Sequence, residues 1–173
     1  LNNHDHTRQV TRYGNDSAHR VESAKLLATM IHTLPGTPYV FQGEEIGMTG
    51  VRFDSIDDYN DIAMKNKYKE EVGKGKDPKV VFDSLLLLSR DNSRTPMQWS
   101  EQDQAGFTNG KPWIKVNPNY KYINVEEALK DPNSVFYYYQ KLITLRKKHD
   151  VMVYGDFTDL SAGDEHLYAY TRN

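Results

Sequence analysis

Residues 16–45 have the sequence DSAHRVESAKLLATMIHTLPGTPYVFQGEE, in which a helical pattern gives way to a strand pattern. A helix over 18–34 is predicted by apolar residues at the helical period: Val21, Ala24, Leu27, Ala28, Ile31 and Leu34. Asp16 or Ser17 is expected to cap it, and Pro35-Gly36 ends it. The short apolar run from Thr37 to Phe41, followed by polar residues 42–45, is typical of a strand buried on both faces. A helix followed by a buried strand indicates an α/β fold.

A second helix is expected over Ser134 to Lys148, capped by Asn133 or Ser134. Its inward positions are Val135, Tyr138, Tyr139, Leu142, Ile143 and Leu145. The basic residues Arg146, Lys147 and Lys148 suit the negative end of its dipole.

The segment from Gly47 to about Asn133 has no regular pattern, although residues 56–72 and 78–89 favour helices. Compact domains usually join neighbouring elements with only a few residues, so a connection of this length indicates a functional excursion. After Asp150 the runs 151–154 and 167–170 are short and β-prone. We therefore expect a boundary near residue 150, between a first domain over 1–150 and a second over 151–173.

The composition excludes several classes of partner. The 173 residues include 22 basic and 24 acidic ones, so neither nucleic acid nor an anionic membrane surface is expected as a partner. No apolar run approaches the roughly 20 residues that cross a bilayer. The absence of cysteine excludes disulfides without choosing a compartment, and we expect a bacterial cytoplasmic protein. The first residues, Leu1 to Asp5, do not have the pattern of a signal peptide, and we expect the chain to be a fragment of a larger protein.

Three polar clusters stand at expected element ends: Asn3-His4-Asp5, the polar residues 42–45, and the run from Arg90 to Trp99. A carboxylate beside an imidazole at a strand end can bind hydroxyl groups in a barrel mouth. The six histidines lack metal-ligand spacing and no glycine-rich phosphate loop is present, so neither a metal nor a cofactor is expected.

Each cluster also has a purely structural interpretation. His4 and Asp5 could simply cap a turn, and the same interpretation is stronger for Glu44 and Glu45. The two arginines Arg90 and Arg94 bracket Asp91, so an internal ion-pair network could order that loop instead of binding substrate.

Together the clusters resemble the α-amylase family of glycoside hydrolases. The segment 1–5 is similar to the end of its seventh barrel strand. The segments 36–39, 42–48, 90–99, 105–108 and 112–114 resemble its group of oligo-1,6-glucosidases, dextran glucosidases and trehalose-6-phosphate hydrolases. This resemblance implies the C-terminal part of a (β/α)8 TIM barrel, from the end of strand seven to helix eight with a long eighth loop. It also implies that residues after about 150 begin an all-β C-terminal domain.

The resemblance further implies a retaining, exo-acting α-glucosidase whose partner is an oligosaccharide substrate, with α-1,6 linkages expected. Asp5 would be the third catalytic carboxylate, and His4 and Arg90 would bind substrate. The nucleophilic aspartate and the acid/base glutamate would precede Leu1, so the fragment alone should be inactive and its unpaired strand should promote self-association.

The sequence departs from the group at His6-Thr7, where relatives often have glutamine and proline, and at Ala63, where many oligo-1,6-glucosidases have glutamate. These departures leave the linkage preference open. The alternatives are a trehalose-6-phosphate hydrolase, a maltase or sucrose isomerase, and a non-catalytic, transporter-associated relative.

Overall fold

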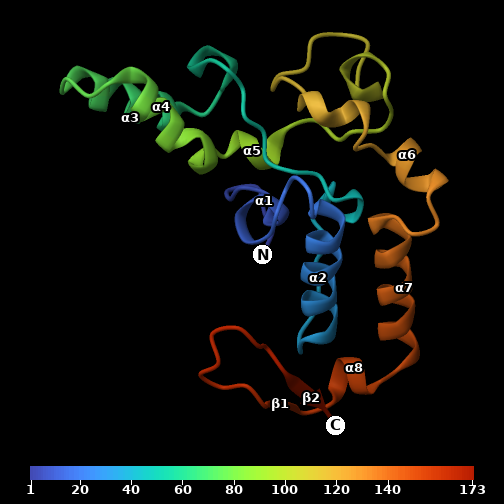
Figure 1. Ribbon diagram of the computed structural model, residues 1–173. Coiled ribbons are helices and arrows are strands. Elements are labelled where there is room, and N and C mark those ends of the chain that lie inside the picture. The colour runs from blue at the N-terminus through green and yellow to red at the C-terminus, as the bar shows by residue number, and fades with distance from the viewer.

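The computed structural model describes residues 1–173 as helices joined by irregular segments, with one small sheet (Figure 1). The α-helices are α1 (Gln9–Tyr13), α2 (Arg20–Thr33), α3 (Ile62–Gly73), α4 (Pro78–Leu85), α5 (Asp91–Arg94), α6 (Val125–Lys130), α7 (Val135–Lys148) and α8 (Val151–Tyr154). The 3-10 helices are η1 (Glu44–Ile46), η2 (Ile56–Asp58), η3 (Leu86–Leu88), η4 (Asp103–Gly106) and η5 (Pro118–Lys121). The strands β1 (Phe157–Asp159) and β2 (Tyr170–Arg172) form one antiparallel pair.

Helices α2 and α7 pack side by side and run in the same direction (Figure 1). Their shared core consists of Val10, Ala24, Ala28, Val135, Tyr139 and Leu142. The His32 ring meets the Tyr139 ring edge-on, with 5.3 Å between the ring centroids. In a (β/α)8 barrel each helix follows a parallel strand, so neighbouring helices run in the same direction. The packing of α2 and α7 has this geometry.

Both long helices lie where the periodicity predicts them, but only one of the predicted caps forms. The Ser134 side chain accepts a hydrogen bond from the Tyr137 N–H, which confirms the cap of α7. The prediction that Asp16 or Ser17 caps α2 is wrong, because the helix begins after His19 without a side-chain cap. Asn15 instead orders the turn before α2, where its Oδ1 accepts hydrogen bonds from the Ser17 and His19 N–H groups.

The strand predicted over Thr37 to Phe41 does not form in this chain. The segment makes no ladder hydrogen bonds, and Tyr39 is 85% exposed. The prediction of a strand buried on both faces is therefore wrong for this structure. The physical reason is that a strand exists only through pairing with neighbouring strands, and no other segment of the chain lies in register with these residues.

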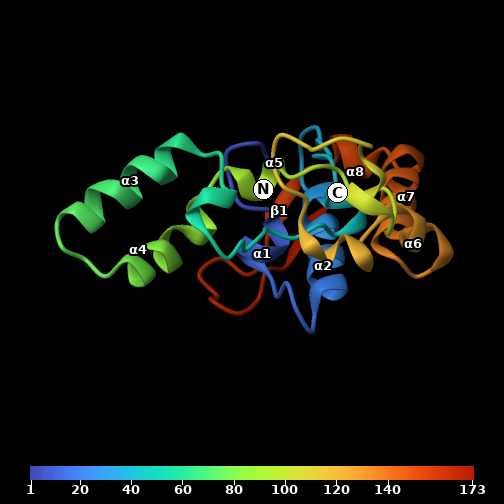
Figure 2. The ribbon, with the colours of Figure 1, turned by 90° about the horizontal axis from the view of Figure 1, so that it is seen from above.

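The long excursion contains a helical hairpin, α3 and α4, that projects away from the two long helices (Figure 2). A separate apolar cluster at the base of the hairpin consists of Val51, Phe53, Tyr59, Met64, Val81 and Leu85. Asp61 and Asp77 cap the two helices by accepting hydrogen bonds from backbone N–H groups of their first turns. The helices expected over 56–72 and 78–89 are thus present, each shortened at one end where a 3-10 turn replaces the helix.

The last residues are attached to the ends of α2 and α7 by two arginines. Arg146 donates hydrogen bonds to the carbonyl oxygens of His32, Leu34 and Met152. Arg172 donates to the carbonyl oxygens of Thr33 and Gly155. Of the two β-prone runs, 167–170 contributes only Tyr170 to a strand, where β2 begins and pairs with β1. The prediction for 151–154 is wrong, because these residues form the short helix α8. Four residues so close to the end of α7 can form a helical turn locally, without the distant partner that a strand would need.

Candidate active site

His4 and Asp5 lie on an exposed turn, where the Asp5 carboxylate is partly accessible to solvent. The turn is held by Asn3, whose Oδ1 accepts the Asp5 N–H at 2.8 Å. The Asp5 side chain does not cap the turn: its Oδ1 accepts Arg94 Nη2 at 2.7 Å, and its Oδ2 lies 3.1 Å from His4 Nε2. The side chain is 49% exposed. The arrangement therefore presents one carboxylate oxygen and one imidazole to a ligand.

Arg94 joins the first and third polar clusters. Besides its ion pair with Asp5, its Nε donates to the carbonyl oxygen of His4 at 2.8 Å. These contacts span about ninety positions in the sequence, and together they hold the turn against α5. An arginine that grips both a carboxylate and a neighbouring carbonyl fixes orientation as well as charge.

Arg90 is held by Asp61. Its Nη2 lies 3.1 Å from Asp61 Oδ1, and its backbone N–H donates to Asp61 Oδ2 at 2.8 Å. Burial opposes ionisation of Asp61, but hydrogen bonds from Arg90 and Met64 outweigh it and lower the pKa of this carboxyl. The Asp61 hydrogen bonds, and secondarily the charge of Asp5, raise the pKa of Arg90. Arg90 is thus a protonated guanidinium that Asp61 holds in place, and the negative charge of Asp5 further stabilises it.

The network expected between Asp91 and its flanking arginines is not present. Asp91 is buried and its Oδ2 accepts the backbone N–H groups of Asn60 and Asp61 at 2.5 and 3.1 Å. Arg90 and Arg94 instead pair with Asp61 and Asp5. The buried Asp91 carboxylate is used by backbone N–H groups of another segment, and the two arginines, at the start and the end of α5, pair with carboxylates elsewhere in the chain.

Glu44 is a buried residue that serves the packing of the fold. It is 2% exposed, and it accepts hydrogen bonds from Asn2 Nδ2 at 2.9 Å and from the Tyr139 hydroxyl at 3.0 Å. Burial raises the pKa of Glu44, and burial together with Glu44 raises the pKa of Tyr139. Glu44 thus has a structural role, but not the predicted one of capping a turn, because its carboxylate accepts hydrogen bonds from two distant side chains.

Arg8 is the second buried support. It is fully buried, and its Nη1 donates to the Gln42 carbonyl oxygen at 2.8 Å and its Nη2 to that of Ser93 at 3.4 Å. Burial lowers the pKa of Arg8 to about 10, against the opposing charges of Glu45 and Glu44, so it stays protonated at neutral pH. Arg8 thus joins the second and third polar clusters through their backbone carbonyl oxygens.

A model of the alpha-amylase catalytic domain matches residues 1–155. The chain belongs to the alpha-amylase family. It is 59% identical over 173 residues to an oligo-1,6-glucosidase of Parageobacillus thermoglucosidasius, a match that covers 99% of this chain and 31% of the relative. It is 49% identical to a trehalose-6-phosphate hydrolase of Bacillus subtilis, over 99% of this chain and 30% of the relative. The chain therefore spans about a third of the length of these relatives.

Solved structures agree with this assignment. The crystal structure of Bacillus licheniformis trehalose-6-phosphate hydrolase matches with a TM-score of 0.97 and 51% identity, over 100% of this chain and 31% of that chain. A trehalulose synthase mutant in complex with Tris matches with a TM-score of 0.95 and 42% identity, over 100% of this chain and 32% of that one. The chain is thus part of an alpha-amylase family TIM barrel, with a small antiparallel sheet at its C-terminal end.

This part of the alpha-amylase fold contains no group of three or more histidine, cysteine or acidic side chains placed to hold a metal ion. None of its helices combines the length and the apolar character that a membrane crossing needs.

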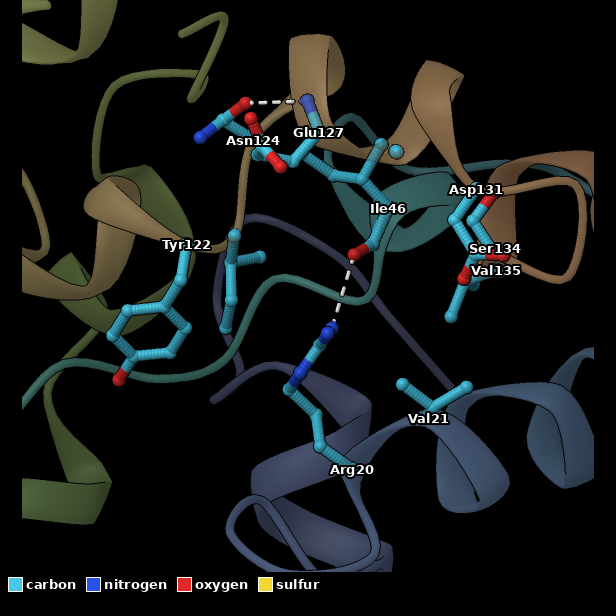
Figure 3. A pocket seen from close by; sticks show the side chains of 11 residues that line it. Arg20, Val21, Ile46, Tyr122, Asn124, Glu127, Asp131, Ser134 and Val135 are labelled. Carbon is cyan, nitrogen blue, oxygen red and sulfur yellow. Dashed lines mark hydrogen bonds between the residues drawn. The ribbon is translucent and has the colours of Figure 1, made fainter. Parts of the chain in front are cut away.

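A partly open seam of about 210 Å³ lies between α2, α6 and α7 (Figure 3). Arg20 extends across it and donates hydrogen bonds to the carbonyl oxygens of Ile46 and Gly47 at 3.1 and 2.9 Å. Tyr122 stands at its edge. Because the guanidinium is already occupied by the backbone, this seam serves to join the helices.

Two residues that matter to the site carry no motif of their own. Asp61 could have been noticed as a helix cap before residues 62–73, but its pairing with Arg90 has no local signal. Arg94 lies inside the recognised run, and its choice of Asp5 over Asp91 depends on a contact 89 positions away.

Asp61→Asn is expected to lower the free energy of unfolding by about 2 kcal/mol at pH 7, because hydrogen bonds to a charged group are lost. The pKa of Asp61 is lowered from 3.8, so its stabilisation is complete above that pH and disappears as the pH falls through the folded-state pKa. Denaturant titrations of wild type and variant should therefore show a constant difference in stability at neutral pH that begins to shrink below about pH 4. The exposed Asp83→Asn is the control, and an equal deficit at every pH would show that Asp61 does not act through its charge.

Proposed function

We propose that the full-length protein is a retaining, exo-acting α-glucosidase that hydrolyses short α-glucosides, with α-1,6-linked oligosaccharides as its preferred substrates. The observation that carries this proposal is the half-exposed Asp5 carboxylate, held by Arg94 beside His4, with Arg90 fixed nearby by Asp61. The identity of 59% to an oligo-1,6-glucosidase, against 49% to a trehalose-6-phosphate hydrolase, favours the first substrate class.

In this proposal Asp5 and His4 bind ring hydroxyls of the glucose unit at the cleaved bond. The transition state of glycoside hydrolysis resembles an oxocarbenium ion. Hydrogen bonds to an ionised carboxylate are about twice as strong as neutral ones, and those that tighten as the ring flattens lower the barrier. Arg90 binds the outer hydroxyls of the same glucose and closes the pocket, which restricts cleavage to the chain end.

The bond-making groups are proposed to come from the remainder of the full-length protein. A nucleophilic aspartate would attack the anomeric carbon, and a glutamate would protonate the leaving oxygen and later activate water. This chain then contributes the third carboxylate. We further propose that residues 1–150 belong to the catalytic barrel and that residues 151–173 begin an all-β domain, for which β1 and β2 are the supporting observation. Self-association through residues 37–41 and a cytoplasmic location stay predictions.

The proposal is tested by assaying the full-length protein on isomaltose, maltose and trehalose 6-phosphate, with the anomer of the released glucose followed by NMR. We expect release of α-glucose, fastest from isomaltose. Hydrolysis of trehalose 6-phosphate alone would favour the second enzyme class. Absence of any hydrolysis, with sugar binding retained, would indicate a non-catalytic relative.

Ala63→Glu in the full-length protein is expected to change the ratio of kcat/KM for isomaltose to that for maltose by about tenfold. Ala63 lies in the first turn of α3, where its N–H donates to Asp61 Oδ1 at 3.0 Å. A carboxylate there would stand beside the Asp61–Arg90 pair, on the side proposed for the leaving sugar. An unchanged ratio would show that this position does not contact the leaving sugar, and Asn66→Glu, farther along the same helix, is the control.

A further inference from the structure

Trp113 is an exposed aromatic residue that lines a polar cavity. Its residue surface is 76% exposed, and the cavity beside it has a volume of about 380 Å³. The cavity is also lined by polar residues, which include Asp57, Asp58, Asn60, Gln104 and Lys111. A large aromatic side chain left facing water among convergent polar groups is typical of a ligand site, because its apolar face gains by being covered.

The cavity is connected to the proposed active site by a short series of contacts. The Asn60 side-chain amide donates to the carbonyl oxygen of Trp113. The Asn60 backbone N–H donates to Asp91 at 2.5 Å, and the adjacent Asp61 holds Arg90. Trp113 is therefore fixed to the same frame as Arg90, on the side where α3 begins.

The chemistry of the cavity suits a neutral polyhydroxylated ring. The two acidic residues Asp57 and Asp58 are balanced by Lys111 and Lys115, and Lys115 Nζ lies 3.2 Å from Asp58 Oδ2. Carboxylates, an amide and an ammonium group offer both acceptors and donors to hydroxyl groups. The C–H face of a pyranose carries partial positive charge and packs on the negative face of an indole.

We propose that the Trp113 cavity is an outer subsite that binds a neutral glucosyl unit of the substrate on the leaving-group side, beyond the two sugars that flank the cleaved bond. This inference rests on the proposed function. An enzyme that closes its pocket over the terminal glucose must let the rest of the substrate chain extend away from it, and the contacts of Asn60 with Trp113 and Asp91 join this cavity to the segment whose Asp61 holds Arg90.

The test is the kinetics of Trp113→Ala in the full-length protein, with isomaltose and isomaltotriose as substrates. Loss of a contact made equally in the ground and transition states raises KM and leaves kcat unchanged. We expect KM for isomaltotriose to rise about tenfold, equivalent to about 1.4 kcal/mol, with kcat unchanged and both constants for isomaltose unchanged. Asp57→Ala should raise KM for isomaltotriose in the same selective way. The Asp57 side chain makes no hydrogen bond within the chain, so this variant also covers the case in which Trp113→Ala fails to fold.

Tyr122→Ala is the matched control, because Tyr122 is a 69% exposed aromatic residue of the same excursion that lines the seam of Figure 3 instead. It should leave both substrates unaffected. Unchanged isomaltotriose kinetics in both cavity variants would overturn the inference while leaving the proposed function intact, and so would an equal loss on both substrates. A higher KM for trehalose 6-phosphate in Lys111→Met would show that the cavity binds a phosphate. That result would also overturn its assignment to a neutral glucosyl unit. Failure of the wild type to hydrolyse any α-glucoside would instead refute the proposed function on which the inference rests.

Discussion

Asp5→Ala in the full-length protein is expected to lower kcat for isomaltose by about 1000-fold, which is the scale for removing one preorganised group that stabilises transition-state charge. The carboxylate is oriented before substrate arrives, since Arg94 binds its Oδ1 and leaves Oδ2 beside His4. An oriented charge acts on the positively charged ring without first reorganising solvent. The loss should therefore be mainly in kcat, as measured by steady-state kinetics.

Two further variants separate charge from shape at this position. Asp5→Asn keeps the size and the capacity to accept hydrogen bonds, so a loss close to that of Asp5→Ala would assign the effect to charge. Arg94→Met removes the hydrogen bond that orients the Asp5 carboxylate. It should lower kcat less than Asp5→Ala does, because the charge of Asp5 is kept while its orientation is lost. If Asp5→Asn were as active as wild type, Asp5 would only bind hydroxyl groups. The exposed Asp83→Ala should be neutral.

Arg8→Met is expected to lower the free energy of unfolding by about 3 to 5 kcal/mol, the range for removing one partner from a buried charged network. The fully buried Arg8 donates to two carbonyl oxygens on distant segments and compensates Glu44 and Glu45. Without the guanidinium, the two carbonyl oxygens lose a hydrogen bond and the two carboxylates lose a compensating charge. The measurement is denaturant unfolding of the full-length protein at neutral pH.

The matched control for this change is Arg12→Met. Arg12 is an exposed arginine of α1, the short helix that begins directly after Arg8, and its guanidinium carbon lies 5.0 Å from the centroid of the Tyr13 ring. Surface changes of this kind usually alter stability by about 0.5 kcal/mol or less. Equal effects of the two substitutions would mean that the buried network around Arg8 does not hold the polar clusters together.

The parts of the fold that sequence predicts well are those decided by local interactions. Helices α2 and α7 follow from apolar spacing, and the Ser134 cap from side-chain chemistry two or three residues away. The strand expected over Thr37 to Phe41 shows the opposite case. Its apolar run indicates burial, but a strand needs neighbours, and none within the chain pairs with it.

The candidate site likewise contains residues that the sequence identifies and residues that only the structure identifies. Motif resemblance singles out His4, Asp5 and Arg90 as site residues, and their roles stay predictions. The residues that orient them could not be foreseen, because Arg94 reaches Asp5 across 89 positions and Asp61 reaches Arg90 across 29. Nearness in sequence favoured Asp91 as the partner of both arginines, and the geometry of α5 directs them elsewhere.

The most direct test of the central claim is a crystal structure of the full-length protein with isomaltose bound, in a variant whose acid/base glutamate is replaced by glutamine. The account predicts that Asp5 Oδ2 and His4 Nε2 both lie within hydrogen-bonding distance of hydroxyls of the terminal glucose, and that Arg90, still paired with Asp61, contacts the same sugar. A glucose unit bound elsewhere, with Asp5 contacting only Arg94 and His4, would contradict it.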